Sequence, residues 1–151
     1  MNESISYMEL ALEQAREAAN RGEVPVGAVL VDTNTGTVLA YDGNRCEQLH
    51  DPTAHAEILV IRQACNERGS PRLNDCDLYV TLEPCTLCAT AVSFARIRRL
   101  YFGAYDPKGG GVEHGARFFE QPTCHHSPEI YGGMQETAAS DLLKKFFAAR
   151  R

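Results

Sequence analysis

Apolar side chains recur at helical spacing in three stretches of the chain, residues 6–20, 54–67 and 136–150. In each stretch they stand three or four positions apart with charged or polar residues between them, which is typical of a helix with one buried face. Gly22 and Gly69 are placed to end the first two helices. In the last helix the residues expected to face the core are Leu142, Leu143, Phe146 and Phe147.

Shorter apolar runs predict strands. Residues 26–31 and 37–42 flank the turn-forming sequence DTNTG and predict a β-hairpin. Residues 77–82 and 99–105 predict two further strands. The segment between them, residues 85–95, has the length of a helix but is apolar on almost every side. Such a helix needs cover from the sheet and from a second surface, such as a partner subunit.

Strands that alternate with helices after an opening hairpin indicate an α/β layered domain with a mixed sheet. Residues 106–133 begin with a glycine run, DPKGGG, which we expect to be a flexible loop within an irregular stretch. Because no internal repeat or linker interrupts the pattern, the sequence predicts a single domain over residues 1–151.

The composition excludes several classes of protein. Apolar residues make up 44% and charged residues 23% of the chain, which argues against a disordered or fibrous protein. The apolar runs are too short to cross a bilayer, and residues 1–20 do not resemble a signal peptide. We therefore expect a cytoplasmic protein with no membrane partner and no organic cofactor, whose six cysteines are reduced thiols.

The net charge of −5 hides an asymmetry between the two parts of the chain. Residues 1–90 carry 6 basic and 14 acidic side chains, a balance of −8, whereas residues 91–151 carry 9 and 6, a balance of +3. A local basic surface can therefore exist on an acidic protein, and a nucleic-acid partner remains possible.

Cys85 and Cys88, in the motif EPCTLC, stand at positions i and i+3 at the start of a predicted helix. Two thiols at this spacing can hold one metal ion, and the open N–H groups of a first helical turn favour the thiolate form. The motif alone is equally compatible with a redox dithiol or with half of a structural zinc knuckle.

His55 favours zinc, because it also stands at the start of a predicted helix, and loops that leave the same strand ends of a sheet meet in one crevice. One histidine and two cysteines leave one tetrahedral position open, which is the pattern of a catalytic zinc site. The other cysteines lack metal-ligand spacing. The run Cys124-His125-His126 is a weaker candidate for a fourth ligand or a second metal, and we expect His50 and His114 to be solvated.

Glu57 follows His55 by two positions, a spacing that separates their side chains by about 200° on a regular helix. They cannot both bind the metal, but both can line a pocket that lies beyond the helix end. Glu57 would then border the open metal position and move protons, which contributes about 10²–10⁴-fold to a rate. The intervening Ala56 is expected to lie against the substrate base, where a larger side chain would obstruct it.

These residues resemble a known family. The order H-x-E followed by P-C-x-x-C is the signature of zinc-dependent nucleobase deaminases. Over nearly its whole length the chain also resembles the bacterial tRNA-specific adenosine deaminases, in the segments EVPVGAVLV (23–31), GNR (43–45), DPTAHAEI (51–58), LYVTLEPCTLCA (78–89) and RIRRLYFGAYDPKGG (96–110).

The resemblance implies a three-layer α/β/α cytidine-deaminase-like fold with a central mixed sheet of about five strands, a homodimer, and one Zn²⁺ ion per subunit. It implies hydrolysis of the wobble adenosine, position 34 of a tRNA anticodon, to inosine. Glu57 would be the proton shuttle, Asn44 would hydrogen-bond the flipped nucleoside, and Asp106 would approach the backbone of a flanking nucleotide. The implied zinc ligands are His55, Cys85 and Cys88.

Two other functions remain open at this stage. A deaminase of free bases or nucleosides, such as guanine, cytosine or adenosine, would share the same metal signature. A non-catalytic, zinc-stabilised RNA-binding module would leave Glu57 idle. A deaminase of small molecules has no need of a basic surface for the anticodon arm, and the candidates for that surface are Arg96, Arg98, Arg99, Lys144, Lys145, Arg150 and Arg151.

Overall fold

The computed structural model describes residues 2–150. Its centre is a five-stranded mixed sheet with the strand order β2-β1-β3-β4-β5. The hairpin strands β1 and β2 are antiparallel, β3 pairs antiparallel with β1, and β4 and β5 continue the sheet in parallel. The strands are β1 (Gly27–Asp32), β2 (Thr37–Gly43), β3 (Cys76–Leu82), β4 (Arg99–Ala104) and β5 (Glu129–Tyr131).

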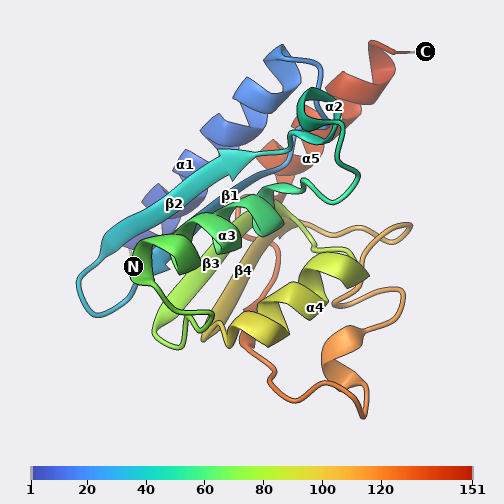
Figure 1. Ribbon diagram of the computed structural model, residues 1–151. Helices are drawn as coiled ribbons and strands as arrows, with labels where there is room; N and C mark the ends of the chain where they lie inside the picture. Colours follow the sequence, from blue (N-terminus) through green and yellow to red (C-terminus); the bar gives the residue numbers. More distant parts are fainter. Residues whose placement is uncertain (1, 151) are drawn as a thin grey trace.

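Helices cover both faces of the sheet, so the expected three-layer α/β/α fold is confirmed (Figure 1). On one face α3 and α4 pack on the strands, and on the other face lie α1 and α5. The helices are α1 (Asn2–Asn20), α2 (Cys46–Leu49), α3 (Ala56–Arg68), α4 (Thr86–Ala95) and α5 (Glu136–Ala148), with one 3₁₀ turn, Phe118–Glu120.

The alternation of side chains along β1 divides the core between the two faces. Ala28 and Leu30 point toward α3 and α4, whereas Val29 and Val31 point toward α1. Both sets are buried, which explains why this strand is a continuous apolar run instead of an alternating one. Gly27 has no side chain because a Cβ atom there would collide with the backbone of α1 at Ala11.

The strand directions bring several chain segments to one edge of the sheet. Because β2, β3 and β4 run in the same direction, their carboxyl ends lie together, and the antiparallel strand β1 begins at that edge. The amino ends of α3 and α4 therefore point at the same edge as the loop that follows β4. This is the position at which open α/β sheets bind ligands.

Four details differ from the expectation. Helix α1 begins at Asn2 rather than near residue 6, and the short helix α2 follows the hairpin. Strand β5 lies in the stretch expected to be irregular, because its three residues are too few to show a pattern. Phe146 faces the core as expected, whereas Phe147 is 47% exposed and does not. Among residues 2–150, no helix combines the length and apolar character needed to cross a membrane.

Candidate active site and metal centre

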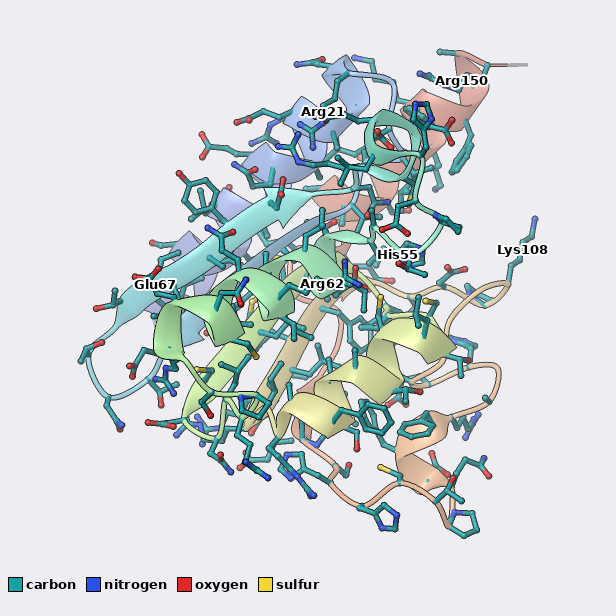
Figure 2. The ribbon with its side chains drawn as sticks, in the orientation of Figure 1. Arg21, His55, Arg62, Glu67, Lys108 and Arg150 are labelled. Atoms are coloured by element: carbon teal, nitrogen blue, oxygen red, sulfur yellow. The ribbon has the colours of Figure 1, made fainter. Side chains whose placement is uncertain are left out.

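His55, Cys85 and Cys88 meet at the edge of the sheet although thirty residues separate the histidine from the first cysteine. His55 is the residue before the first turn of α3, and Cys85 is its counterpart before α4. Neither side chain caps its own helix, so both are free to point out from the helix end. Figure 2 labels His55 at this end of α3. Cys88 follows on the first turn of α4 and is fully buried.

The spacing of the three donor atoms fits a tetrahedral zinc ion. The His55 Nδ1 atom lies 3.3 Å from the Cys88 Sγ atom and 3.6 Å from the Cys85 Sγ atom. Ligands bound to zinc at their usual distances are about 3.6 Å apart at tetrahedral angles. All three atoms lie within 4.8 Å of one another, and this is the one cluster of such donors within the described part of the chain.

The thiols are prepared for a cation. The pKa of Cys85 is lowered most by a hydrogen bond from the Cys88 thiol and to a smaller extent by one from His55. The same Cys85–Cys88 hydrogen bond, together with burial, raises the pKa of Cys88. The Cys88 thiol and the His55 imidazole therefore both favour a thiolate at Cys85. A thiolate is the form that binds zinc, and zinc binding releases thiol protons.

Glu57 lies within the same corner without joining the donor cluster. It is almost completely buried, and burial raises the pKa of its carboxyl group to about 7. Its own backbone N–H and the Cys88 thiol offset only part of this effect. A carboxyl group poised near neutral pH can both take up and release a proton under ordinary conditions.

A cavity of about 340 Å³ opens in front of these residues, within the size range of small-ligand sites. Its wall combines apolar side chains with a few polar groups from five segments that the fold brings together. It is lined by Val24, Val26, Asn44, Cys46, His55, Glu57, Leu82, Glu83, Cys85, Asp106 and Gly109.

Asn44 lines this cavity, as the resemblance implied, and its side chain also makes a structural hydrogen bond. Its Oδ1 atom accepts the N–H of Ala56 at 2.8 Å, which satisfies an open donor at the start of α3. This bond fixes the amide group so that its NH₂ is left for the cavity. Ala56 itself is fully buried in the core cluster and is not part of the cavity wall, so its contact with a substrate base stays a prediction.

Asp106 also lines the cavity, but its carboxylate is occupied by its own loop. The Oδ1 atom accepts the N–H groups of Lys108 and Gly109, at 3.2 and 2.9 Å. The side chain of Lys108 extends from this loop toward solvent (Figure 2). A contact between Asp106 and a flanking nucleotide stays a prediction.

Glu83 is the residue of this site that the sequence reasoning missed. Its side chain is fully buried, and its two oxygens accept the backbone N–H groups of residues 106, 112, 113 and 114. The Oε1 atom also pairs with the Nδ1 atom of the His114 imidazole, at 2.8 Å. Burial raises the pKa of Glu83, but these hydrogen bonds outweigh burial and hold the pKa below its ordinary value. A charged residue at the end of a buried strand was the available signal.

This network overturns two expectations. His114 is half-buried against Glu83 rather than solvated. The glycine run is not a flexible loop, because Gly110 and Gly111 are buried, and a Cβ atom on either would collide with Glu83 or with the first turn of α4. His50, by contrast, is exposed as expected.

The Cys124-His125-His126 run lies away from the metal cluster. Cys124 contacts Ser93 at 3.6 Å, and the His126 Nε2 atom lies 2.7 Å from the Ile97 carbonyl oxygen. The structure therefore does not bring this run to the cavity, and the three donors already described keep one metal position open.

The expected basic surface is divided between two places. Arg98 and Arg99 stand at the amino end of β4, on the edge away from the cavity, and pair with Asp77 and Glu129. Lys144, Lys145 and Arg150 are exposed on the last turns of α5 and just after it. Arg96 lies with the first group, and Arg151 lies outside the described residues.

Comparison with known proteins agrees with this geometry. Residues 1–104 match the family described as the cytidine and deoxycytidylate deaminase zinc-binding region. The chain is 60% identical over 151 residues to a tRNA-specific adenosine deaminase of Agrobacterium fabrum, covering 100% of this chain and 98% of that protein. It is 40% identical over 151 residues to the protein of the same name in Bacillus subtilis, covering 100% of this chain and 92% of the relative.

Solved structures show the same relationship. A structure from a study of A-to-I editing by tRNA:A34 deaminases superposes with a TM-score of 0.89 at 62% identity, over 91% of this chain and 99% of that one. A guanine deaminase from Nitrosomonas europaea superposes with a TM-score of 0.83 at 22% identity, over 95% and 84%, and shares the fold. The chain therefore belongs to the cytidine and deoxycytidylate deaminase family and, within it, to the tRNA-specific adenosine deaminases.

Proposed function

We propose that this protein hydrolyses adenosine to inosine at the wobble position, position 34, of a tRNA anticodon. The observation that carries this proposal is the placement of Glu57 beside the His55, Cys85 and Cys88 donors at the base of a cavity of ligand size. The family relationship supplies the substrate class, because relatives similar over their whole length are tRNA-specific adenosine deaminases.

The three donors would hold one Zn²⁺ ion per subunit, and the bound ion supplies a water molecule whose pKa is lowered to about 7. Glu57 would take one proton from the attacking water and deliver it to N1 of the adenine ring as the C6–O bond forms. It would then take the remaining proton from the hydroxyl group at C6 and deliver it to the amino group, which leaves as ammonia when the C6–N bond breaks. Asn44 orients the nucleoside through the amide NH₂ that its bond to Ala56 leaves open.

A second hollow favours a polynucleotide substrate over a free base. It adjoins the catalytic cavity, encloses about 430 Å³, and shares Asp106 and Gly109 with it. Its far side is formed by α5 and includes Phe147, which is 47% exposed, while Tyr105 lines it at 40% exposure. Exposed aromatic rings beside a base-sized cavity are suited to stack a flanking base, and the basic end of α5 lies beyond them.

The exposed side of α4 supports a homodimer. Phe94 is 75% exposed and Leu87 is 43% exposed on a helix that has no cover on that side. We place the second copy of the chain there, and the substitution Phe94→Glu should shift the protein toward a monomer in sedimentation.

Because its substrate is a tRNA, we place the protein in the cytoplasm.

The deciding experiment incubates the zinc-loaded protein with tRNA and, separately, with adenosine, cytidine and guanine. We expect ammonia release and inosine at position 34 from tRNA alone. Product from a free base but not from tRNA would overturn the proposal in favour of a small-molecule deaminase. The affinity for tRNA should fall steeply with salt, and Phe147→Ala should weaken it while Tyr131→Ala, a remote exposed aromatic residue, should not.

A further inference from the structure

Asn44 reaches the catalytic cavity from the loop between β2 and α2, and hydrogen bonds from neighbouring segments hold this loop in place. The Asn44 backbone N–H donates to the Val26 carbonyl at 3.1 Å. The next residue, Arg45, donates its N–H to the Ala54 carbonyl at 3.0 Å. The position of the Asn44 amide therefore depends on how firmly this loop is fixed.

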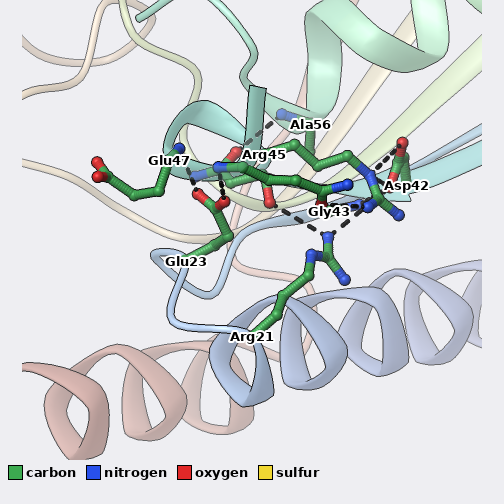
Figure 3. A network of polar contacts seen from close by, with 9 residues as sticks. Arg21, Glu23, Asp42, Gly43, Arg45, Glu47 and Ala56 are labelled. Carbon is green, nitrogen blue, oxygen red and sulfur yellow. Dashed lines mark hydrogen bonds and ion pairs between the residues drawn. The ribbon is translucent and has the colours of Figure 1, made fainter. Parts of the chain in front are cut away.

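Glu23 fixes the far end of the loop from the segment between α1 and β1. Glu23 is only 2% exposed. Its carboxylate oxygens accept the N–H groups of Glu47 at 3.1 Å and Gln48 at 2.8 Å (Figure 3). These two N–H groups are open donors at the start of α2. A buried carboxylate is costly unless it is fully hydrogen-bonded, so this contact has little freedom to shift.

Arg21 fixes the near end of the loop. Its Nη2 atom donates to the Asn44 carbonyl oxygen at 3.2 Å and lies 3.9 Å from Asp42, whose carboxylate pairs with Arg45 at 2.9 Å (Figure 3). Gly43 permits this approach, because a Cβ atom there would collide with the backbone of α1 at Gln14. Arg21 and Glu23, both in the segment between α1 and β1, thus hold the loop at Asn44 and at the residues after it.

We propose that Glu23 and Arg21 are positioning residues that set where the Asn44 amide stands in the cavity, and so control how well the enzyme binds its nucleoside. The inference rests on the proposed function, since it takes Asn44 as the group that meets the substrate. Glu23 bonds the loop backbone and not the Asn44 side chain itself. It therefore acts through the loop, and the loop moves when one of the two acceptor oxygens of Glu23 is lost.

The test compares Glu23→Gln, Asn44→Ala and the double variant, with Glu17→Gln as a control because Glu17 is an exposed glutamate near the end of α1. An amide at position 23 leaves one buried N–H without an acceptor, and we expect kcat/KM to fall about tenfold, chiefly through KM, with zinc content unchanged. If Glu23 acts through Asn44, the double variant is no slower than Asn44→Ala alone. Fully additive losses would overturn the proposal.

A second measurement does not depend on activity. Hydrogen exchange of the Ala56 amide reports its bond to Asn44, and we expect faster exchange in Glu23→Gln and in Arg21→Ala but not in Glu17→Gln. Unchanged Ala56 exchange in both variants would overturn the proposal even if activity fell. A wild-type protein that leaves tRNA adenosine intact would instead count against the proposed function, while the exchange result would still decide whether the two residues hold Asn44.

Discussion

Two buried glutamates line the same cavity and are held in opposite ways. Glu57, on the α3 side, has few hydrogen-bond donors near its carboxyl group, and burial raises its pKa to about 7. Glu83, on the side of β3 and the following loops, accepts four backbone N–H groups and one imidazole, and its pKa lies below the ordinary value. The number of donors, rather than burial, separates the two residues.

The contrast teaches which carboxyl group moves protons and which one builds the wall. A group that is protonated and deprotonated near pH 7 with little cost suits general acid–base work. A group that is held ionised by five donors cannot give up that charge without releasing the loop from Asp106 to His114. The following predictions test this division of labour.

The largest effect is expected for Glu57→Gln. The substitution keeps the size of the side chain and removes the exchangeable proton, so kcat should fall by about 10²–10⁴-fold while zinc stays bound. Single-turnover deamination of tRNA and zinc analysis measure the two properties. Glu67→Gln, an exposed glutamate on the same helix, serves as the control. Normal turnover in a zinc-loaded Glu57→Gln protein would remove Glu57 from the mechanism.

Glu83→Gln should instead damage stability first. The amide keeps one acceptor oxygen and turns an NH₂ group toward buried N–H donors, so the free energy of unfolding should fall by about 3–5 kcal/mol. Activity should fall as a consequence, because the loop that carries Asp106 is released. Urea unfolding measures the loss, with Glu113→Gln on the same loop as the control. A stable but inactive variant would show that Glu83 has a direct role in catalysis and would erase the contrast with Glu57.

The sequence predicted the metal donors and Glu57 in this cavity but missed Glu83, and the reason is physical. His55, Glu57, Cys85 and Cys88 combine residue types and helix-start positions that few other chemistries share. Glu83 stands between a buried strand and Pro84, and Glu23 stands two positions before Pro25. Their partners are backbone N–H groups, and a sequence does not show which N–H groups will converge. Strand β5 was missed likewise, because it owes its existence to pairing with β4.

The fold followed the same division. The hairpin, the central strands and the long helices were predictable because each carries its own periodicity. The exposure of Phe147 was not predictable, because Phe146 and Phe147 are equivalent by pattern, and only the packing of α5 against the sheet selects the one that is buried. The separation of Arg98 and Arg99 from the basic end of α5 likewise depends on which edge of the sheet each segment occupies.

The two glutamates should give the metal-free protein opposite pH dependences of stability. For Glu57 the pKa is about 7 in the folded state and about 4.5 in the unfolded state, so the folded protein holds an extra proton between these values. Stability therefore falls as pH rises from about 4.5 to 7, by roughly 3 kcal/mol. For Glu83 the folded pKa is lowered, so its contribution is present above the unfolded value and is lost as pH falls below it.

Urea unfolding of the metal-free protein at several pH values, with and without each substitution, isolates these two contributions. Glu57→Gln should flatten the decline between about pH 4.5 and 7, and Glu83→Gln should flatten only the acid side. If both substitutions changed the same pH window, the two carboxyl groups would titrate as one unit and the contrast between them would fail.

The smallest effect is expected for His114→Ala, which removes one of the five donors to Glu83 and leaves the four backbone N–H groups in place. Because the imidazole is about one-third exposed, water can replace it, and we expect a loss of about 1 kcal/mol in the free energy of unfolding. The denaturant midpoint at constant slope measures it, with His125→Ala, an exposed histidine, as the control. A loss as large as that of Glu83→Gln would mean that the imidazole, rather than the backbone, holds this wall of the cavity.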